Sequence, residues 1–160
     1  MVITMEVHGD LKRFLNAQER DYARAFVEIK NGRKQSHWMW FIFPQIAGLG
    51  LSETAKFYAI KDLAEATAYL QHPLLGSRLV EIVRALLAVE GRTASQIMGS
   101  PDDLKLRSSM TLFSLIEGAD PVFQQVLEKY YEGEPDQKTL TIVTELARLN
   151  LEAHRCGDAL

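Results

Sequence analysis

The chain has 160 residues, of which 47% are hydrophobic, and a formal net charge of −3 from 18 basic and 21 acidic side chains. This length predicts a single domain whose core needs no disulfide, metal or repeat array for stability. Since no run holds more than a few cations, the sequence argues against general nucleic-acid binding but is compatible with a small local anion site.

Cysteine and histidine usage excludes several further classes. Cys156 is the single cysteine, so no internal disulfide can form, which is typical of a reducing cytoplasm. The first ten residues lack the basic and apolar segments of a signal peptide, and no stretch reaches 18 apolar residues. No histidine pair is three or four residues apart and no Cys-x-x-Cys occurs, so we expect a cytoplasmic protein outside the membrane, without a metal site or cofactor.

The first predicted helix carries apolar residues at steps of three and four along one face, from Phe14 to Ile29. A polar loop over residues 31–36 follows, and then the aromatic stretch 37–45, which reads His-Trp-Met-Trp-Phe-Ile-Phe-Pro-Gln. Nearly every residue there is apolar, so periodicity cannot separate a helix from a strand. We favour a short buried helix, which Pro44 would end.

The rest of the chain predicts further helices with short connections, and no strand set or hairpin. The start signals are Asp10, Ser52, Asp62, Pro73, Thr93, Ser100-Pro101 and Asp120-Pro121, and the stop signals are Gly32, Gly91, Gly99, Gly118 and Gly133. The last helix is predicted over about 136–152. We therefore predict an all-α, single-domain orthogonal bundle of about seven to nine short helices over residues 10–152, with an N-terminal extension at 1–9 and a flexible C-terminal tail at 153–160.

One group of candidate functional residues leads into the aromatic stretch. Arg33, Lys34 and His37 directly precede Trp38 and Trp40. Cationic and aromatic groups together suit a stacked base or a phosphate. The alternative is that the rings are core and that the cations only follow the end of a helix.

Two other groups lie further along the chain. Lys105, Ser108 and Ser109 form a polar stripe on an otherwise apolar helix; alternatively, the hydroxyls bond to carbonyls of their own helix. His72 precedes a proline and Arg78 lies in the helix that follows, where both would line a pocket or, alternatively, serve as a cap and a solvated side chain.

Several of these motifs resemble the family called domain of unknown function 1810. They are Phe14-x-x-Ala17-Gln18-x-x-x-Tyr22, Gly32-Arg33-Lys34, Ser36 to Gln45, Gly48-Leu49-Gly50-x-Ser52, Ala68-Tyr69-Leu70-x-His72-Pro73-x-Leu75-Gly76-x-Arg78-Leu79 and Lys105-x-x-Ser108 to Phe113. The resemblance covers roughly residues 10–150 and implies an all-helical, bacterial-type protein with no assigned activity. Some members carry the label calpastatin, yet no pattern here points to protease inhibition. The layout is also similar to helical domains proposed to handle ADP-ribose-like ligands.

These observations lead to one leading hypothesis and one alternative. The chain is expected to bind a small anionic nucleotide or ADP-ribose-like ligand beside the aromatic stretch, with hydrolysis as a further option. The catalytic candidates are His37 and Glu28, and the ligand-binding candidates are Arg33, Lys34, Trp38, Trp40, Gln45, His72, Arg78, Lys105, Ser108 and Ser109. The alternative is a non-catalytic interaction module, or a homodimer through the last helix, with the aromatic stretch as plain core.

Overall fold

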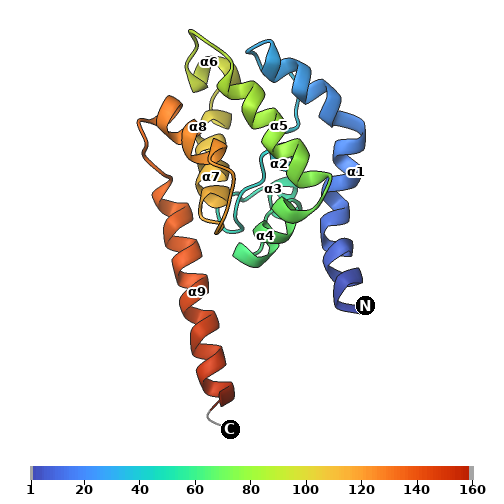
Figure 1. The fold of residues 1–160 in the computed structure, drawn as a ribbon, viewed down its shortest axis with the longest axis vertical. Helices are drawn as coiled ribbons and strands as arrows, with labels where there is room; N and C mark the ends of the chain where they lie inside the picture. Colours follow the sequence, from blue (N-terminus) through green and yellow to red (C-terminus); the bar gives the residue numbers. More distant parts are fainter. Residues whose placement is uncertain (1, 159–160) are drawn as a thin grey trace.

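A computed structural model describes the backbone of residues 2–158 and the side chains of residues 11–155. The side chains of the predicted N-terminal extension, and that of Cys156, lie outside the described set. Within it the chain forms nine helices and no strand, which confirms the all-α, single-domain prediction (Figure 1). The helices are α1 (Val2–Lys30), α2 (Met39–Ile42), α3 (Glu53–Phe57), α4 (Leu63–Gln71), α5 (Leu75–Leu87), α6 (Ala94–Met98), α7 (Asp102–Ser114), α8 (Val122–Tyr131) and α9 (Gln137–Asp158).

Three of the predicted helix starts are confirmed by capping hydrogen bonds, whereas α7 begins after Ser100-Pro101 without a side-chain cap. The Ser52 hydroxyl accepts from the backbone N–H of residue 55 at 3.1 Å, and the Asp62 carboxylate accepts from that of residue 65 at 2.8 Å. Thr93 forms a reciprocal capping box with Gln96 at the start of α6. These side chains satisfy N–H groups that have no partner inside the helix.

The two terminal helices are longer than predicted. Because α1 begins at Val2, Asp10 lies inside the helix, and its prediction as an N-cap is wrong. No proline interrupts residues 2–10, and the one glycine there is tolerated at a cost of about 1 kcal/mol. Helix α9 likewise continues to Asp158. The predicted domain limits at 10 and 152 both fall within helices and stay predictions.

The helices pack around α5 and α7. Helix α1 packs against α5 and α2, α5 also contacts α4 and α8, and α7 contacts α4, α6, α8 and the start of α9. Figure 1 shows that the C-terminal part of α9 projects away from the other helices.

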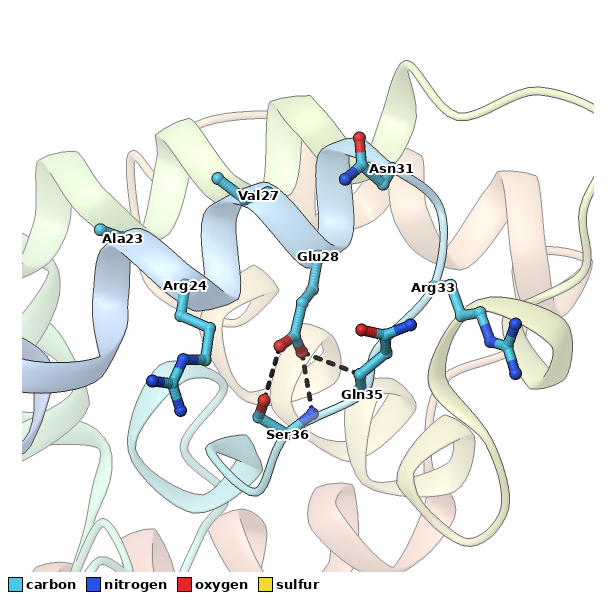
Figure 2. Close-up of a pocket in the computed structure, with 8 residues that line it drawn as sticks. All are labelled: Ala23, Arg24, Val27, Glu28, Asn31, Arg33, Gln35 and Ser36. Atoms are coloured by element: carbon cyan, nitrogen blue, oxygen red, sulfur yellow. Dashed lines mark hydrogen bonds between the residues drawn. The ribbon is translucent and has the colours of Figure 1, made fainter.

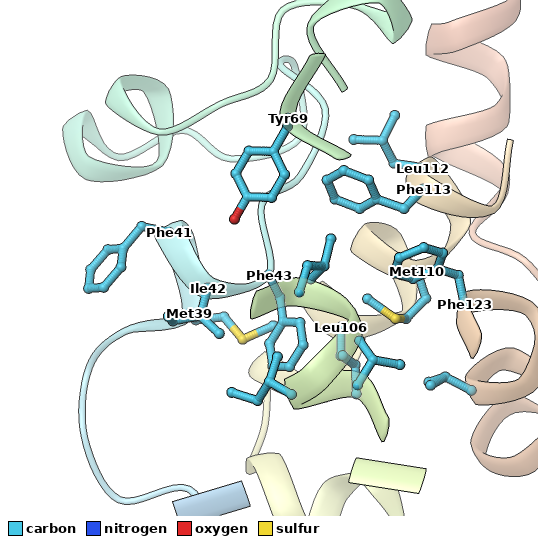
Figure 3. Close-up of a cluster of buried hydrophobic side chains, with 14 of the residues drawn as sticks. Met39, Phe41, Ile42, Phe43, Tyr69, Leu106, Met110, Leu112, Phe113 and Phe123 are labelled. Carbon is cyan, nitrogen blue, oxygen red and sulfur yellow. The ribbon is translucent and has the colours of Figure 1, made fainter. Parts of the chain in front are cut away.

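The aromatic stretch supplies the centre of the core. Trp38 is 1% exposed and Phe43 is fully buried, and their ring centroids lie 6.0 Å apart. In Figure 3 the short helix α2 places Phe43 among side chains of α7, and Tyr69 of α4 faces Phe113, whose centroid is 5.5 Å away. Burying rings of this size stabilises a fold by about 1.5–3 kcal/mol each, so the predicted short buried helix serves chiefly as core.

One glycine permits the close approach of α4 and α5. A Cβ atom built on Gly76 would lie 1.9 Å from the carbonyl oxygen of Leu70. Two backbone segments can come this near only where no side chain intervenes. The tight turn between α4 and α5 therefore depends on Gly76.

Candidate functional site

The carboxylate of Glu28, near the end of α1, is surrounded by donors from the segment that follows. Its Oε1 accepts from the backbone N–H of Gln35 at 2.8 Å, from that of Ser36 at 2.9 Å and from the Trp38 indole N–H at 2.9 Å. Its Oε2 accepts from the Ser36 hydroxyl at 2.6 Å. Figure 2 shows the chain folded back under α1 so that the donors of Gln35 and Ser36 converge on Glu28.

The backbone conformation at the end of α1 explains why the chain folds back beneath this helix. Gly32 adopts φ +75°, a left-handed conformation that favours glycine. The backbone N–H of Gly32 donates to the carbonyl of Ile29, and that of Arg33 to the carbonyl of Glu28, which is the usual helix-ending pair of bonds. This confirms Gly32 as the predicted stop. The reversal brings residues 35–38 back beneath the last turn of α1.

The environment of Glu28 keeps it ionised. Burial raises its pKa, but the hydrogen bonds from Ser36, Gln35 and Trp38 outweigh burial and lower the pKa from 4.5 to about 2. Its hydrogen bonds come from Gln35, Ser36 and Trp38 and not from His37, whose exposed side chain has no hydrogen bond or ion pair within residues 11–155. Glu28 thus acts in the structure as the anchor of the 31–36 loop.

A surface groove of about 740 Å³ lies beside this anchor, within the size range of small-molecule sites. It is lined by Ala23, Arg24, Val27, Glu28, Asn31, Arg33, Gln35 and Ser36. Arg24 and Arg33 are exposed, and neither has an ion pair or hydrogen bond to another described side chain. Figure 2 places their guanidinium groups on opposite sides of Glu28.

Sequence reasoning identified Glu28 and Arg33 in this groove but missed Arg24, Asn31 and Gln35. Arg24 lies one helical turn before Glu28 and Asn31 one turn after it, so their spacing on α1 was a usable signal.

A second cluster joins the predicted lysines to the indoles. Lys34 Nζ lies 2.9 Å from Asp102 Oδ2 and 4.9 Å from the centre of the Trp38 ring. Lys105 Nζ lies 3.6 Å from Asp102 Oδ1 and 5.5 Å from the centre of the Trp40 ring. Asp102, which the sequence analysis did not select, therefore links α7 to the 31–36 loop.

This cluster leaves little room for a ligand. The Lys34 side chain is 7% exposed and also donates to the carbonyl of Ser36 at 2.6 Å. Trp40 and Gln45 line a crevice of only about 10 Å³, which is no larger than the space for one water molecule. With Trp38 buried, the arrangement corresponds to the alternative in which the rings are core.

The other predicted residues are dispersed over the fold. The Arg78 guanidinium lies 5.0 Å from the centre of the Tyr22 ring and 3.4 Å from Gln18 Oε1, and no described contact joins it to the lysine cluster. His72 Nδ1 accepts from the backbone N–H groups of residues 74 and 75 at 3.1 and 3.2 Å. His72 therefore acts as a cap for the start of α5.

The serines of α7 divide into two environments. The Ser108 hydroxyl lies within hydrogen-bond distance of two acceptors for its one proton, the carbonyl of Leu104 at 3.2 Å and the Asp136 carboxylate at 3.1 Å. Asp136 in turn caps α9 by accepting from Thr139, so Ser108 docks α9 on α7. Ser109 is fully buried, and its hydroxyl has no hydrogen-bond partner among the side chains of residues 11–155 or the backbone of residues 2–158.

No helix within residues 2–158 is long and apolar enough to cross a membrane. The described side chains include no group of three or more His, Cys, Asp or Glu that could hold a metal ion.

Comparison with known proteins places the chain in a family. The crystal structure of the conserved hypothetical protein Rv1873 from Mycobacterium tuberculosis is similar, with a TM-score of 0.83 and 50% sequence identity over 84% of this chain and 96% of that chain. No curated protein matches the chain significantly. The family model described as "Protein of unknown function (DUF1810)" matches residues 8–143. Because that match spans most of the sequence, the chain belongs to the DUF1810 family.

Proposed function

We propose that the protein binds a small anionic ligand, of the nucleotide or ADP-ribose-like class, in the groove between the last turns of α1 and the 31–36 loop. The observation that carries the proposal is the pair Arg24 and Arg33. Both cations line a groove of ligand size, and neither is neutralised by a described acidic side chain. Guanidinium groups suit phosphate and carboxylate oxygens because their planar donors bind two oxygens at once.

The wall of the groove is held in place before any ligand arrives. Four donors fix the Glu28 carboxylate, which ties the segment carrying Arg33 and Gln35 to α1. A wall already ordered loses less conformational entropy on binding. This supports a binding site over a loosely solvated loop.

The proposal is one of binding, without an assigned reaction. General bases work best when their pKa lies near the operating pH, and that of Glu28 is lowered to about 2. His37 has no described partner that would orient its ring. The structural evidence therefore supports ligand recognition by arginine and does not assign proton transfer to this pair.

Titration with ADP and ADP-ribose tests the proposal, by calorimetry and by tryptophan fluorescence. Trp38 donates to Glu28 in the groove wall, so its emission should report binding. Arg24→Ala and Arg33→Ala should each weaken binding by about tenfold, the loss expected for one charge-assisted hydrogen bond. Arg84→Ala is the control, because Arg84 pairs with Asp120 outside the groove. An absence of binding at millimolar ligand, or an equal loss in the control, would refute the proposal.

Association through α9 is a second candidate function. Leu149 is 48% exposed and Leu151 is 66% exposed, on a helix that Figure 1 shows leaving the other helices. Residues 144–158 also lie beyond the matched family region. Helices in proteins are stabilised mostly by packing an apolar face against another surface, so a partner surface would stabilise the projecting part of α9.

The charge order on α9 favours a second copy as that partner. Glu145, Arg148, Glu152 and Arg155 alternate in sign and are spaced symmetrically about Asn150. In an antiparallel pair, each acidic side chain would face a basic one of the other copy. Sedimentation equilibrium should show a dimer that Leu149→Lys dissociates, whereas a wild-type monomer at high concentration would remove this candidate.

A further inference from the structure

We infer that the ligand of the Glu28 groove carries two separate anionic groups joined by an uncharged, hydroxyl-bearing portion, as a sugar bisphosphate does. This inference rests on the anion-binding groove of the proposed function, and there it favours such a ligand over ADP or ADP-ribose, whose phosphates are joined directly to each other. Three features of the groove carry it: the placement of the two arginines, the charge between them, and the hydrogen-bonding capacity that remains there.

The two arginines serve different ends of the groove. Arg24 belongs to α1, whereas Arg33 belongs to the loop after it. Figure 2 shows their side chains pointing away from each other, with Glu28, Gln35 and Ser36 between them. Each guanidinium group can therefore bind its own anionic group, so two anionic groups held apart by a spacer suit this arrangement better than one small anion does.

The middle of the groove disfavours an anion. Glu28 is ionised there, because its pKa lies near 2, and a like charge beside it would be repelled. The backbone N–H groups of Gln35 and Ser36, which would otherwise suit a phosphate, already donate to Glu28. The central part of the ligand is therefore uncharged.

The middle of the groove does favour hydroxyl groups. Glu28 Oε1 accepts three hydrogen bonds, but Oε2 accepts only the one from Ser36. Since a carboxylate oxygen has two lone pairs, Oε2 can accept one further donor. The exposed amide side chains of Asn31 and Gln35 line the same space and supply both donors and acceptors.

Calorimetry with a matched set of phosphates tests this inference on the full chain at constant ionic strength. The probes are inorganic phosphate, pyrophosphate, fructose 6-phosphate, fructose 1,6-bisphosphate and hexane-1,6-diol bisphosphate. Fructose 1,6-bisphosphate should bind at least about tenfold more tightly than fructose 6-phosphate, since its second anionic group binds intramolecularly. Pyrophosphate should bind no more tightly than phosphate, and the hexanediol compound should bind more weakly than the sugar bisphosphate.

The arginine variants distinguish the two ends. Arg24→Ala and Arg33→Ala should each reduce the affinity for fructose 1,6-bisphosphate to that for the monophosphate. Equal affinities for the mono- and bisphosphate would overturn the inference while leaving the proposed function intact, and equal affinities for the two bisphosphates would overturn the hydroxyl-bearing middle. If none of the five phosphates binds, the inference is overturned. The proposed function still stands in that case if ADP binds and its binding depends on either arginine.

Discussion

Replacing Glu28 by glutamine should destabilise the fold strongly, although the two side chains have nearly the same shape. The carboxylate receives four donors from Gln35, Ser36 and Trp38. An amide oxygen at the position of Oε1 keeps three of these donors, and the NH₂ group at the position of Oε2 can donate to the Ser36 hydroxyl oxygen. The variant therefore keeps the contacts but loses the charge, and hydrogen bonds to a charged group are worth about 1.5–3 kcal/mol against about 1 kcal/mol for neutral ones.

The pKa of Glu28 sets the size of this effect. A difference of one pKa unit between the folded and unfolded states corresponds to about 1.4 kcal/mol of stability. The lowering from 4.5 to about 2 therefore indicates that Glu28→Gln lowers the free energy of unfolding by about 3 kcal/mol at pH 7. For a domain of this size, this amounts to a fall of roughly 6–12 °C in Tm.

The stability difference between wild type and Glu28→Gln should also decrease as the pH falls. A carboxyl group whose pKa is lowered by folding stabilises the fold above its unfolded pKa, and this stabilisation is lost as pH falls. The difference between wild type and Glu28→Gln should thus be constant above about pH 5.5 and should shrink between about pH 5 and pH 2. Urea unfolding of both proteins across this range measures the difference directly.

Suitable controls isolate the hydrogen-bond cluster. Glu117→Gln, at an exposed position of the loop after α7, should change stability by no more than about 0.5 kcal/mol. Trp38→Phe removes one donor, so the double variant with Glu28→Gln should cost less than the sum of the single variants by about 1 kcal/mol. A cost below about 1 kcal/mol for Glu28→Gln, or no change with pH, would refute the reasoning.

Substitutions at four further positions test other parts of the fold. Ser109→Ala removes a buried hydroxyl that has no partner among the described residues, and it should raise the free energy of unfolding by about 1 kcal/mol. Ser108→Ala breaks the bond to Asp136 and should lower the free energy of unfolding by about the same amount. Denaturant unfolding in which both variants change stability in the same direction would contradict this. Gly76→Ala places a Cβ 1.9 Å from a backbone oxygen and should cost about 3 kcal/mol or more, so a thermal melt like that of wild type would be inconsistent with the α4–α5 packing. His72→Ala should cost about 1 kcal/mol and His72→Asn much less, because only asparagine retains a capping acceptor; equal losses would exclude the capping role.

The sequence by itself determined the helical composition of this protein, because the relevant signals are local. Ser52, Asp62 and Thr93 cap helices through bonds that span three residues, and Gly32 ends α1 through its own φ angle. Such contacts are encoded in neighbouring residues, so they can be predicted without a tertiary structure.

Only the tertiary structure decided which polar side chains share a site. Periodicity shows which face of a helix is buried, but not which segment folds over the other face. Lys34 meets Asp102, 68 positions away in the sequence, and Arg24 became a groove residue because the 31–36 loop returns beneath α1. Glu28, chosen as a partner for His37, instead anchors that loop, since the reversal at Gly32 delivers donors to it. Side chains as far apart in the chain as Lys34 and Asp102 become neighbours only through the packing of whole helices, which no local pattern specifies.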